Sequence, residues 1–156
     1  MTQKEQAIIF PMPTDALLHE REVAWRVKLP DDYKEFIKKE NGVIPSKRYF
    51  HFGHNEKVID RFLAILAISG EKVAEVYDIG VVSTQLEGRI VFDEDNVGMQ
   101  LIPIAALYGG DFLCLNYVED PDNPNICIWY HEESYELEPA IEFLANNFTE
   151  FLAMLY

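Results

Sequence analysis

The chain has 156 residues and a formal net charge of -14, from 13 Lys and Arg against 27 Asp and Glu. Its length predicts one domain covering residues 1–156, and its 49% apolar and 13% aromatic residues exclude a disordered chain. No apolar run approaches the roughly 18 residues of a membrane span, and the N-terminal stretch lacks the apolar core of a secretory signal. We therefore expect a cytoplasmic protein.

The negative charge is concentrated in one half of the chain. Residues 1–89 carry 14 acids and 13 bases, whereas residues 90–156 carry 13 acids and no Lys or Arg. Nucleic acids and anionic membranes are bound through Lys and Arg, so the second half should repel both. The same field should attract basic partners.

Two helices are expected near the N-terminus. Thr14 has the hydroxyl of an N-cap, and the helix that follows it should run to Trp25 and end before Pro30. Pro30 then opens a second helix with acids in its first turn, and Asn41-Gly42 has the sequence of a left-handed C-cap.

The middle of the chain has weaker patterns. It predicts strands at 48–52 and 58–68 around a turn at 53–55, and a short helix at 70–77. A further helix is expected to be capped by Ser83 and to run toward Phe92. Gly109-Gly110-Asp111 lacks the Lys and the following helix of a phosphate loop, so we interpret it as a turn that needs positive φ before a strand.

Two strands with clear patterns follow, at 112–118 and 125–130. The segment between them, E-D-P-D-N-P, contains two prolines, which favours a hairpin with a turn-rich loop. Cys114 and Cys127 lie in these strands, and we expect two buried thiols, with a cross-strand disulfide as the alternative.

The tail, residues 137–156, carries apolar residues at helical spacing and is predicted to be helical, with Asn146-Asn147 as a point of division. Helices interleaved with hairpins predict an α+β fold. Its twisted sheet should be mainly antiparallel or mixed, with helices packed against it.

Several blocks of the chain, in this order, resemble the SUKH superfamily. Residues 22–33 (E-V-A-W-R-V-K-L-P-D-D-Y) resemble its opening E-x-x-L-G-x-x-L-P-x-D-Y, which K-E-F-I-K-K-E-N-G continues. The blocks L-I-P-I-A, G-G-D-F-L-C-L-N-Y and I-C-I-W-Y-H-E resemble a second signature, and F-L-A-N-N-F-T-E-F-L-A-M-L resembles the closing helix. Trp25-Arg26 departs from the usual Leu-Gly, and Asn116 stands where an acid is common. The motif residues, to which we assign structural roles, are Glu22, Leu29, Pro30, Tyr33, Asn41, Gly42, Gly109, Gly110, Asp111 and Trp129.

The resemblance implies a binding protein without chemistry or a cofactor of its own. The superfamily includes bacterial immunity proteins that neutralise toxins, many of them nucleases, and the fungal cell-wall-assembly regulator. A nuclease is basic around its nucleic-acid site, so an acidic inhibitor would be steered to that face. The leading hypothesis is an immunity protein for a basic toxin, and the alternative is an intracellular regulatory adaptor. The sequence predicts no oligomeric state.

Aromatic residues among acids are typical of interface hot spots that face a basic partner. For the strand residues Tyr117 and Trp129 we favour burial in the core. The remaining candidates for partner binding lie in the hairpin loop and after the second strand: Glu119, Asp120, Asp122, Glu132, Glu133, Tyr135 and Glu136.

Metal and catalytic sites have weaker support. His51 and His54 have H-x-x-H spacing, and Asp60 or His131 could complete a zinc site, but a surface pair is the favoured interpretation. The chain has no G-x-S-x-G motif, and D-E-D-N-V-G lacks the ligand alternation of a calcium loop. We therefore expect no catalytic residue and no metal; an enzyme using clustered carboxylates is a third hypothesis.

Overall fold

The computed structural model describes residues 7–67, 73–95 and 98–156. The helices are α2 (Asp15–Trp25), α3 (Asp31–Lys39), α4 (Ile79–Leu86) and α5 (Phe148–Ala153), with short 3-10 helices η1 (Val73–Tyr77) and η2 (Glu87–Ile90). The strands are β1 (Tyr49–Phe52), β2 (Asn55–Phe62), β3 (Leu101–Leu107), β4 (Phe112–Asn116), β5 (Asn125–Trp129) and β6 (Ile141–Ala145). Each strand pairs antiparallel with the next, in the order β1 to β6, which confirms the predicted α+β class.

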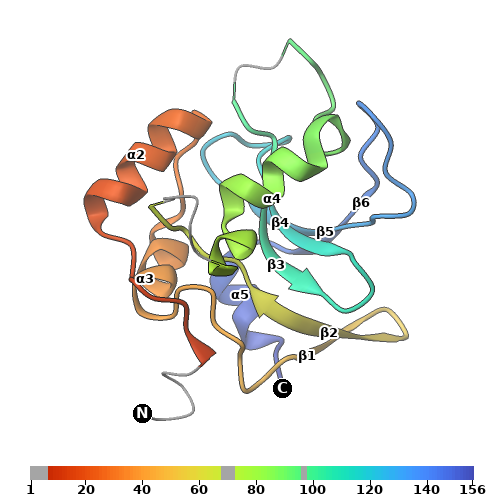
Figure 1. The fold of residues 1–156 in the computed structure, drawn as a ribbon. Helices are drawn as coiled ribbons and strands as arrows, with labels where there is room; N and C mark the ends of the chain where they lie inside the picture. Colours follow the sequence, from red (N-terminus) through yellow and green to blue (C-terminus); the bar gives the residue numbers. More distant parts are fainter. Residues whose placement is uncertain (1–6, 68–72, 96–97) are drawn as a thin grey trace.

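Helices cover both faces of the sheet. Figure 1 shows α4 in front of the central strands and α5 behind them, with α2 and α3 to the left. The central strands β3, β4 and β5 are therefore buried along nearly their whole length. Strands covered on both sides are apolar at successive positions rather than at alternate ones, as these are. Among the residues that the structure describes, no helix is long and apolar enough to cross a membrane.

An aromatic cluster joins the helices α3 and α5 to the strands. The ring of Phe148 on α5 lies 5.2 Å from that of Tyr33 and 5.0 Å from that of Phe36, both on α3. Phe36 also lies 4.8 Å from Phe62 at the end of β2. Burial of a side chain of this size stabilises a fold by roughly 1.5–3 kcal/mol, so this cluster fixes α3 and α5 on the sheet.

Asn41 and Gly42 tie the N-terminal segment to the end of β2. The Asn41 amide donates to the carbonyl oxygens of Ile9, Pro11 and Ile65 and accepts the N–H of Ile65 at 2.9 Å. Gly42 has φ +65, and a Cβ there would lie 2.6 Å from Ile9 Cδ1. Both residues are required by close packing and backbone shape, which supports a structural role for this motif.

The departure from the family pattern at Trp25-Arg26 has a structural consequence. Arg26 follows α2 in the left-handed region, at φ 56 and ψ 44, and its N–H caps the helix on Glu22 and Val23. Glycine adopts this conformation without steric cost. The family's usual Gly therefore suits this position better than the Arg found here.

The prediction of a wholly helical tail is wrong. Residues 141–145 form β6 on the edge of the sheet, and only Phe148–Ala153 is helical. Pairing with β5 and a bulge near Leu144 override the helical spacing of the apolar residues. Asn147 marks the change, because its side chain accepts the N–H of Glu150 at 2.8 Å as an N-cap.

Two predictions in the middle of the chain also need correction. Asp78, not Ser83, caps α4, since its carboxylate accepts the N–H of Val81 at 3.2 Å; Ser83 lies inside the helix. Residues 73–77 form a 3-10 helix, while residues 68–72 of the predicted elements lie outside the described part. The second strand, β2, begins at Asn55 and ends at Phe62, so it starts and ends earlier than expected.

Candidate functional site

The predicted partner-binding residues occupy two segments at opposite ends of β5. Residues 117–124 lead into Asn125, and residues 130–140 follow Trp129. A strand of this length separates its two ends by about 14 Å, at roughly 3.4 Å per residue. We call the first segment the hairpin loop and the second the post-strand loop. The fold brings Glu132, Glu133, Tyr135 and Glu136 together in the post-strand loop but does not join them to the hairpin loop.

The hairpin loop holds its shape through one carboxylate. Glu119, Asp120 and Asp122 are exposed, and Asp120 Oδ1 accepts the N–H groups of Asp122 at 2.9 Å and Asn123 at 3.2 Å. These backbone donors favour the ionised form and hold the pKa of Asp120 below its usual value of 3.8. Asp120 therefore orders the loop, which leaves Glu119 and Asp122 as its outward-facing charges.

A polar groove of about 540 Å³ lies between the hairpin loop and the L-P motif. Asp122 and Asn123 line it from the loop, and Leu29 and Pro30 line it from the link between α2 and α3. Asp32 and Thr149 line another side of the groove. They are joined because Asp32 Oδ2 accepts the N–H and the hydroxyl of Thr149 at 3.0 and 2.8 Å.

Two partly buried hydrogen bonds hold the L-P motif in place beside this groove. Glu22 Oε2 accepts the N–H of Leu29 at 2.8 Å, and the Tyr117 hydroxyl donates to the carbonyl of Lys28 at 2.7 Å. Tyr117 is 5% exposed, so its predicted burial is confirmed. Burial also raises its pKa above the usual tyrosine value, which keeps the hydroxyl protonated as a donor.

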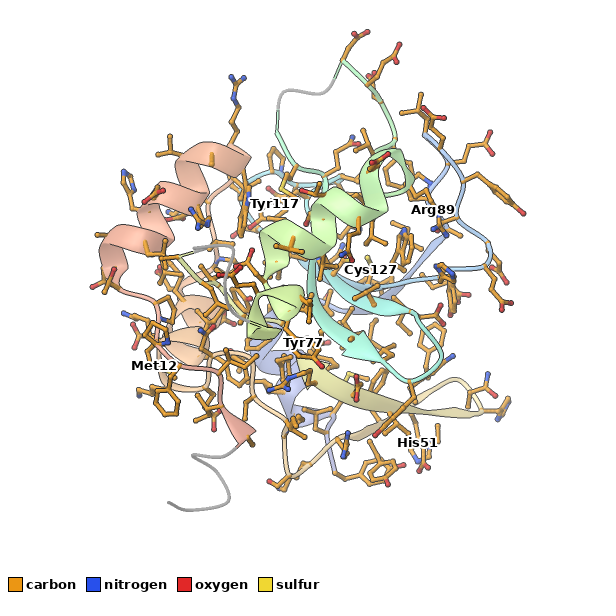
Figure 2. All side chains as sticks on the ribbon, viewed as in Figure 1. Met12, His51, Tyr77, Arg89, Tyr117 and Cys127 are labelled. Carbon is orange, nitrogen blue, oxygen red and sulfur yellow. The ribbon has the colours of Figure 1, made fainter. Side chains whose placement is uncertain are left out.

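Arg89 organises the post-strand loop, a role that no sequence pattern predicted. Its Nε donates to the carbonyl of Ser134 at 3.0 Å, and its Nη2 donates to the carbonyl of His131. The guanidinium carbon lies 5.2 Å from the Trp129 ring centre, and the Trp129 Nε1–H donates to the Arg89 carbonyl at 2.9 Å. Figure 2 shows Arg89 beside this loop, at the margin of the sheet.

The glycine turn at residues 109–111 contacts the post-strand loop. Gly109 and Gly110 have φ of +99 and +97, which confirms the predicted need for positive φ. Asp111 Oδ1 accepts the N–H of His131 at 2.8 Å, which joins this turn to the post-strand loop. Trp129 is fully buried, as expected. Residues of the second family signature thus hold the post-strand loop in position.

The post-strand loop presents acids and an aromatic ring to solvent. Glu132, Glu133 and Glu136 are exposed, and Tyr135 is 64% exposed, as predicted for these positions. Among the residues that the structure describes, every ion pair lies within residues 15–38. The acids of the second half are therefore not neutralised by ion pairing within the described chain.

The other chemical candidates do not assemble into a centre. The His51 ring contacts the hydroxyl of Tyr156, while His131 lies in the post-strand loop. Within residues 7–67, 73–95 and 98–156, no group of three or more His, Cys, Asp and Glu side chains could hold a metal. Cys114 and Cys127 lie directly opposite each other as buried free thiols, as predicted, and burial raises the pKa of Cys114.

Comparisons with known proteins extend the resemblance across most of the chain. The family model described as SUKH_6, SMI1-KNR4 cell-wall, matches residues 15–152. The SPbeta prophage-derived uncharacterized protein YokK of Bacillus subtilis (strain 168) is 30% identical over 149 residues, which cover 91% of this chain and 74% of that protein. No solved structure gives a significant match.

Proposed function

Because the chain belongs to the SMI1-KNR4 family of the SUKH superfamily, we propose that it is an immunity protein that neutralises a cognate toxin in the cytoplasm. The toxin is a basic protein, most simply a nuclease domain. The observation that carries this proposal is the second half of the chain, which has no Lys or Arg. Seven of its 13 acids are exposed in the two loops, and none of them forms an ion pair in the described part of the chain.

Inhibition works by occlusion and requires no turnover. A nuclease holds the phosphate backbone with Lys and Arg, and exposed carboxylates of an inhibitor compete for those same groups. Complementary charge also speeds diffusional encounter, from about 10⁵–10⁶ M⁻¹s⁻¹ toward 10⁸–10⁹ M⁻¹s⁻¹ at low salt. Neither cysteine serves as a nucleophile in this proposal, because both thiols are buried.

We assign the main contact to the post-strand loop. Arg89 and Asp111 already hold its backbone, so binding costs less ordering entropy than it would for an unsupported loop. Tyr135 supplies an exposed aromatic anchor among Glu132, Glu133 and Glu136. The hairpin loop, at the other end of β5, adds Glu119, Asp120 and Asp122 to the attracting field.

A second candidate is a regulatory adaptor that binds an intracellular protein, which the cell-wall description of the matching family favours. It uses the same fold with a different partner. The Bacillus subtilis relative is described as prophage-derived and uncharacterized, so its name favours neither candidate.

Co-expression with the protein encoded next to this chain tests the proposal. Immunity predicts that the neighbouring protein alone arrests growth, and that this chain restores growth and co-purifies with it. A neighbouring protein that neither arrests growth nor binds would contradict immunity and leave the adaptor function ahead. A turnover that Glu132→Gln abolishes without loss of folding would instead reveal an enzyme.

A further inference from the structure

The two edge strands of the sheet, β1 and β6, differ in what covers their outer backbone groups. At the β1 edge, Tyr49 and Tyr156 exchange backbone hydrogen bonds of 3.1 and 3.0 Å, and their rings stack with centres 6.1 Å apart. Tyr156 therefore covers the start of that edge. At the other edge, β6 pairs only with β5 among the residues described, and Figure 1 shows it at the right-hand margin of the sheet.

Alternation along β6 identifies its unpaired backbone groups. Tyr130 donates its N–H to the carbonyl of Ala140 at 2.9 Å, and Ile141 and Phe143 lie opposite Trp129 and Cys127. In an antiparallel pair, residues that bond to the neighbouring strand alternate with residues whose N–H and C=O point away from it. Ile141 and Phe143 therefore direct their backbone groups outward, with the two-residue spacing that an added strand uses.

The edge of β6 has some protection against pairing, but the protection depends on charge sign. Soluble proteins protect exposed edges with charged side chains, Pro, bulges or a covering helix. Here the charged residue is an exposed Glu142, a bulge lies near Leu144, and Phe143 is 54% exposed. Residues 132–142 contain five Glu and no Lys or Arg, so the edge has an apolar residue within a strongly negative rim.

We propose that the outer edge of β6 binds an extended basic segment of the protein partner as a seventh strand. The proposal rests on the proposed function and specifies how that partner is bound. An apolar side chain of the added strand packs on Phe143, and its Lys or Arg side chains face Glu142 and the post-strand loop. A second copy of this chain fits poorly, because its β6 edge would bring the same negatively charged rim against this one.

A peptide of alternating Lys and Val tests this pairing, with a peptide of alternating Glu and Val as the charge control. Amide exchange of the isotope-labelled chain is measured by NMR with each peptide. The Lys peptide should slow exchange at Ile141 and Phe143 by about tenfold or more, and the Glu peptide should leave it unchanged. Binding of the Lys peptide without protection of these two amides would overturn the proposal. Protection of these amides that grows with protein concentration in the absence of peptide would overturn the proposal, because it would show that a second copy of the chain pairs with β6.

Phe143→Pro removes the outward N–H, and Phe143→Ala is the matched control that keeps it. Proline should abolish peptide pairing, whereas alanine should weaken it only in part; equal binding by the two variants would overturn the proposal. Amide exchange at the inner strands shows whether each variant is folded. If a variant does not fold, the peptide experiment on the wild-type chain still tests the proposal.

The neighbouring toxin separates this inference from the proposed function. Full neutralisation by Phe143→Pro would refute the edge site and leave immunity standing. Peptide pairing at β6 in a chain that neutralises no toxin would refute immunity and leave the edge site standing.

Discussion

Charges in the two halves of this chain serve different purposes. In residues 15–38, acids and bases pair with each other, as Lys38 does with Asp15 at 3.1 Å and Glu35 at 2.9 Å. Residues 90–156 contain no Lys or Arg, and most of their exposed acids lie in loops. The first arrangement satisfies its charges within the fold, whereas the second leaves them available to a partner.

Arg89 is the point where the halves meet, and its removal should have the largest effect on stability. Arg89→Gln loses the donors to Ser134 and His131 and the contact with Trp129. We expect the free energy of unfolding to fall by about 2–3 kcal/mol. Arg26→Gln is the matched control, because it makes the same charge change at an exposed position. Equal chemical-denaturation midpoints for the two variants would show that Arg89 does not hold the loop.

Charge reversal in the post-strand loop should change binding rather than stability. The triple variant Glu132→Lys, Glu133→Lys and Glu136→Lys should slow association with the toxin by about tenfold. Its control is Asp93→Lys, Glu94→Lys and Asp95→Lys, which reverses three exposed acids elsewhere in the same half. Both variants change the net charge from -14 to -8, so surface-plasmon association rates compare position at constant charge. Equal slowing would mean that net charge alone, and not this loop, determines association.

Arg26→Gly should change stability in the first half of the chain without changing binding by the second half. Glycine relieves the left-handed backbone at φ 56, although it adds entropy to the unfolded chain. We expect the free energy of unfolding, measured by thermal or chemical denaturation, to rise by about 0.5–1 kcal/mol, with no change in toxin binding. A loss of stability would show that the Arg26 side chain contributes more than its backbone conformation costs.

The smallest expected effect concerns Asp120. Its folded-state pKa is depressed by the N–H groups of Asp122 and Asn123, so its contribution to loop order is present above the unfolded pKa and is lost as the pH falls through the folded pKa. NMR titration should place the Asp120 midpoint below 3.8, and Asp120→Asn should disturb amide shifts only within the hairpin loop. An unshifted midpoint would contradict the proposed role of Asp120 in the loop.

Local signals predicted much of this fold. Thr14, Pro30 and Asn41-Gly42 marked the first two helices, and the two-proline connector marked the β4–β5 hairpin. The spacing of Ile141, Leu144 and Phe148 fits a helix, and only pairing with β5 decides that β6 is a strand. Propensity cannot resolve such a segment, because the deciding contacts are distant in sequence.

The candidate site was predictable in composition but not in arrangement. The acids and Tyr135 are exposed as expected, yet β5 places them in two separate loops. Arg89 was missed because its contacts with His131 span 42 residues. One signal was available: it is the last basic residue before the base-free half.

The most direct test of the account is the salt dependence of association between the wild-type chain and the toxin encoded beside it. Stopped-flow rates are measured from low to high ionic strength. Electrostatic capture by uncompensated acids predicts an association rate that falls steeply as salt screens the charges, with a much smaller change in dissociation. An association rate that stays flat across this range would contradict the claim that the second half of the chain is built to attract a basic partner.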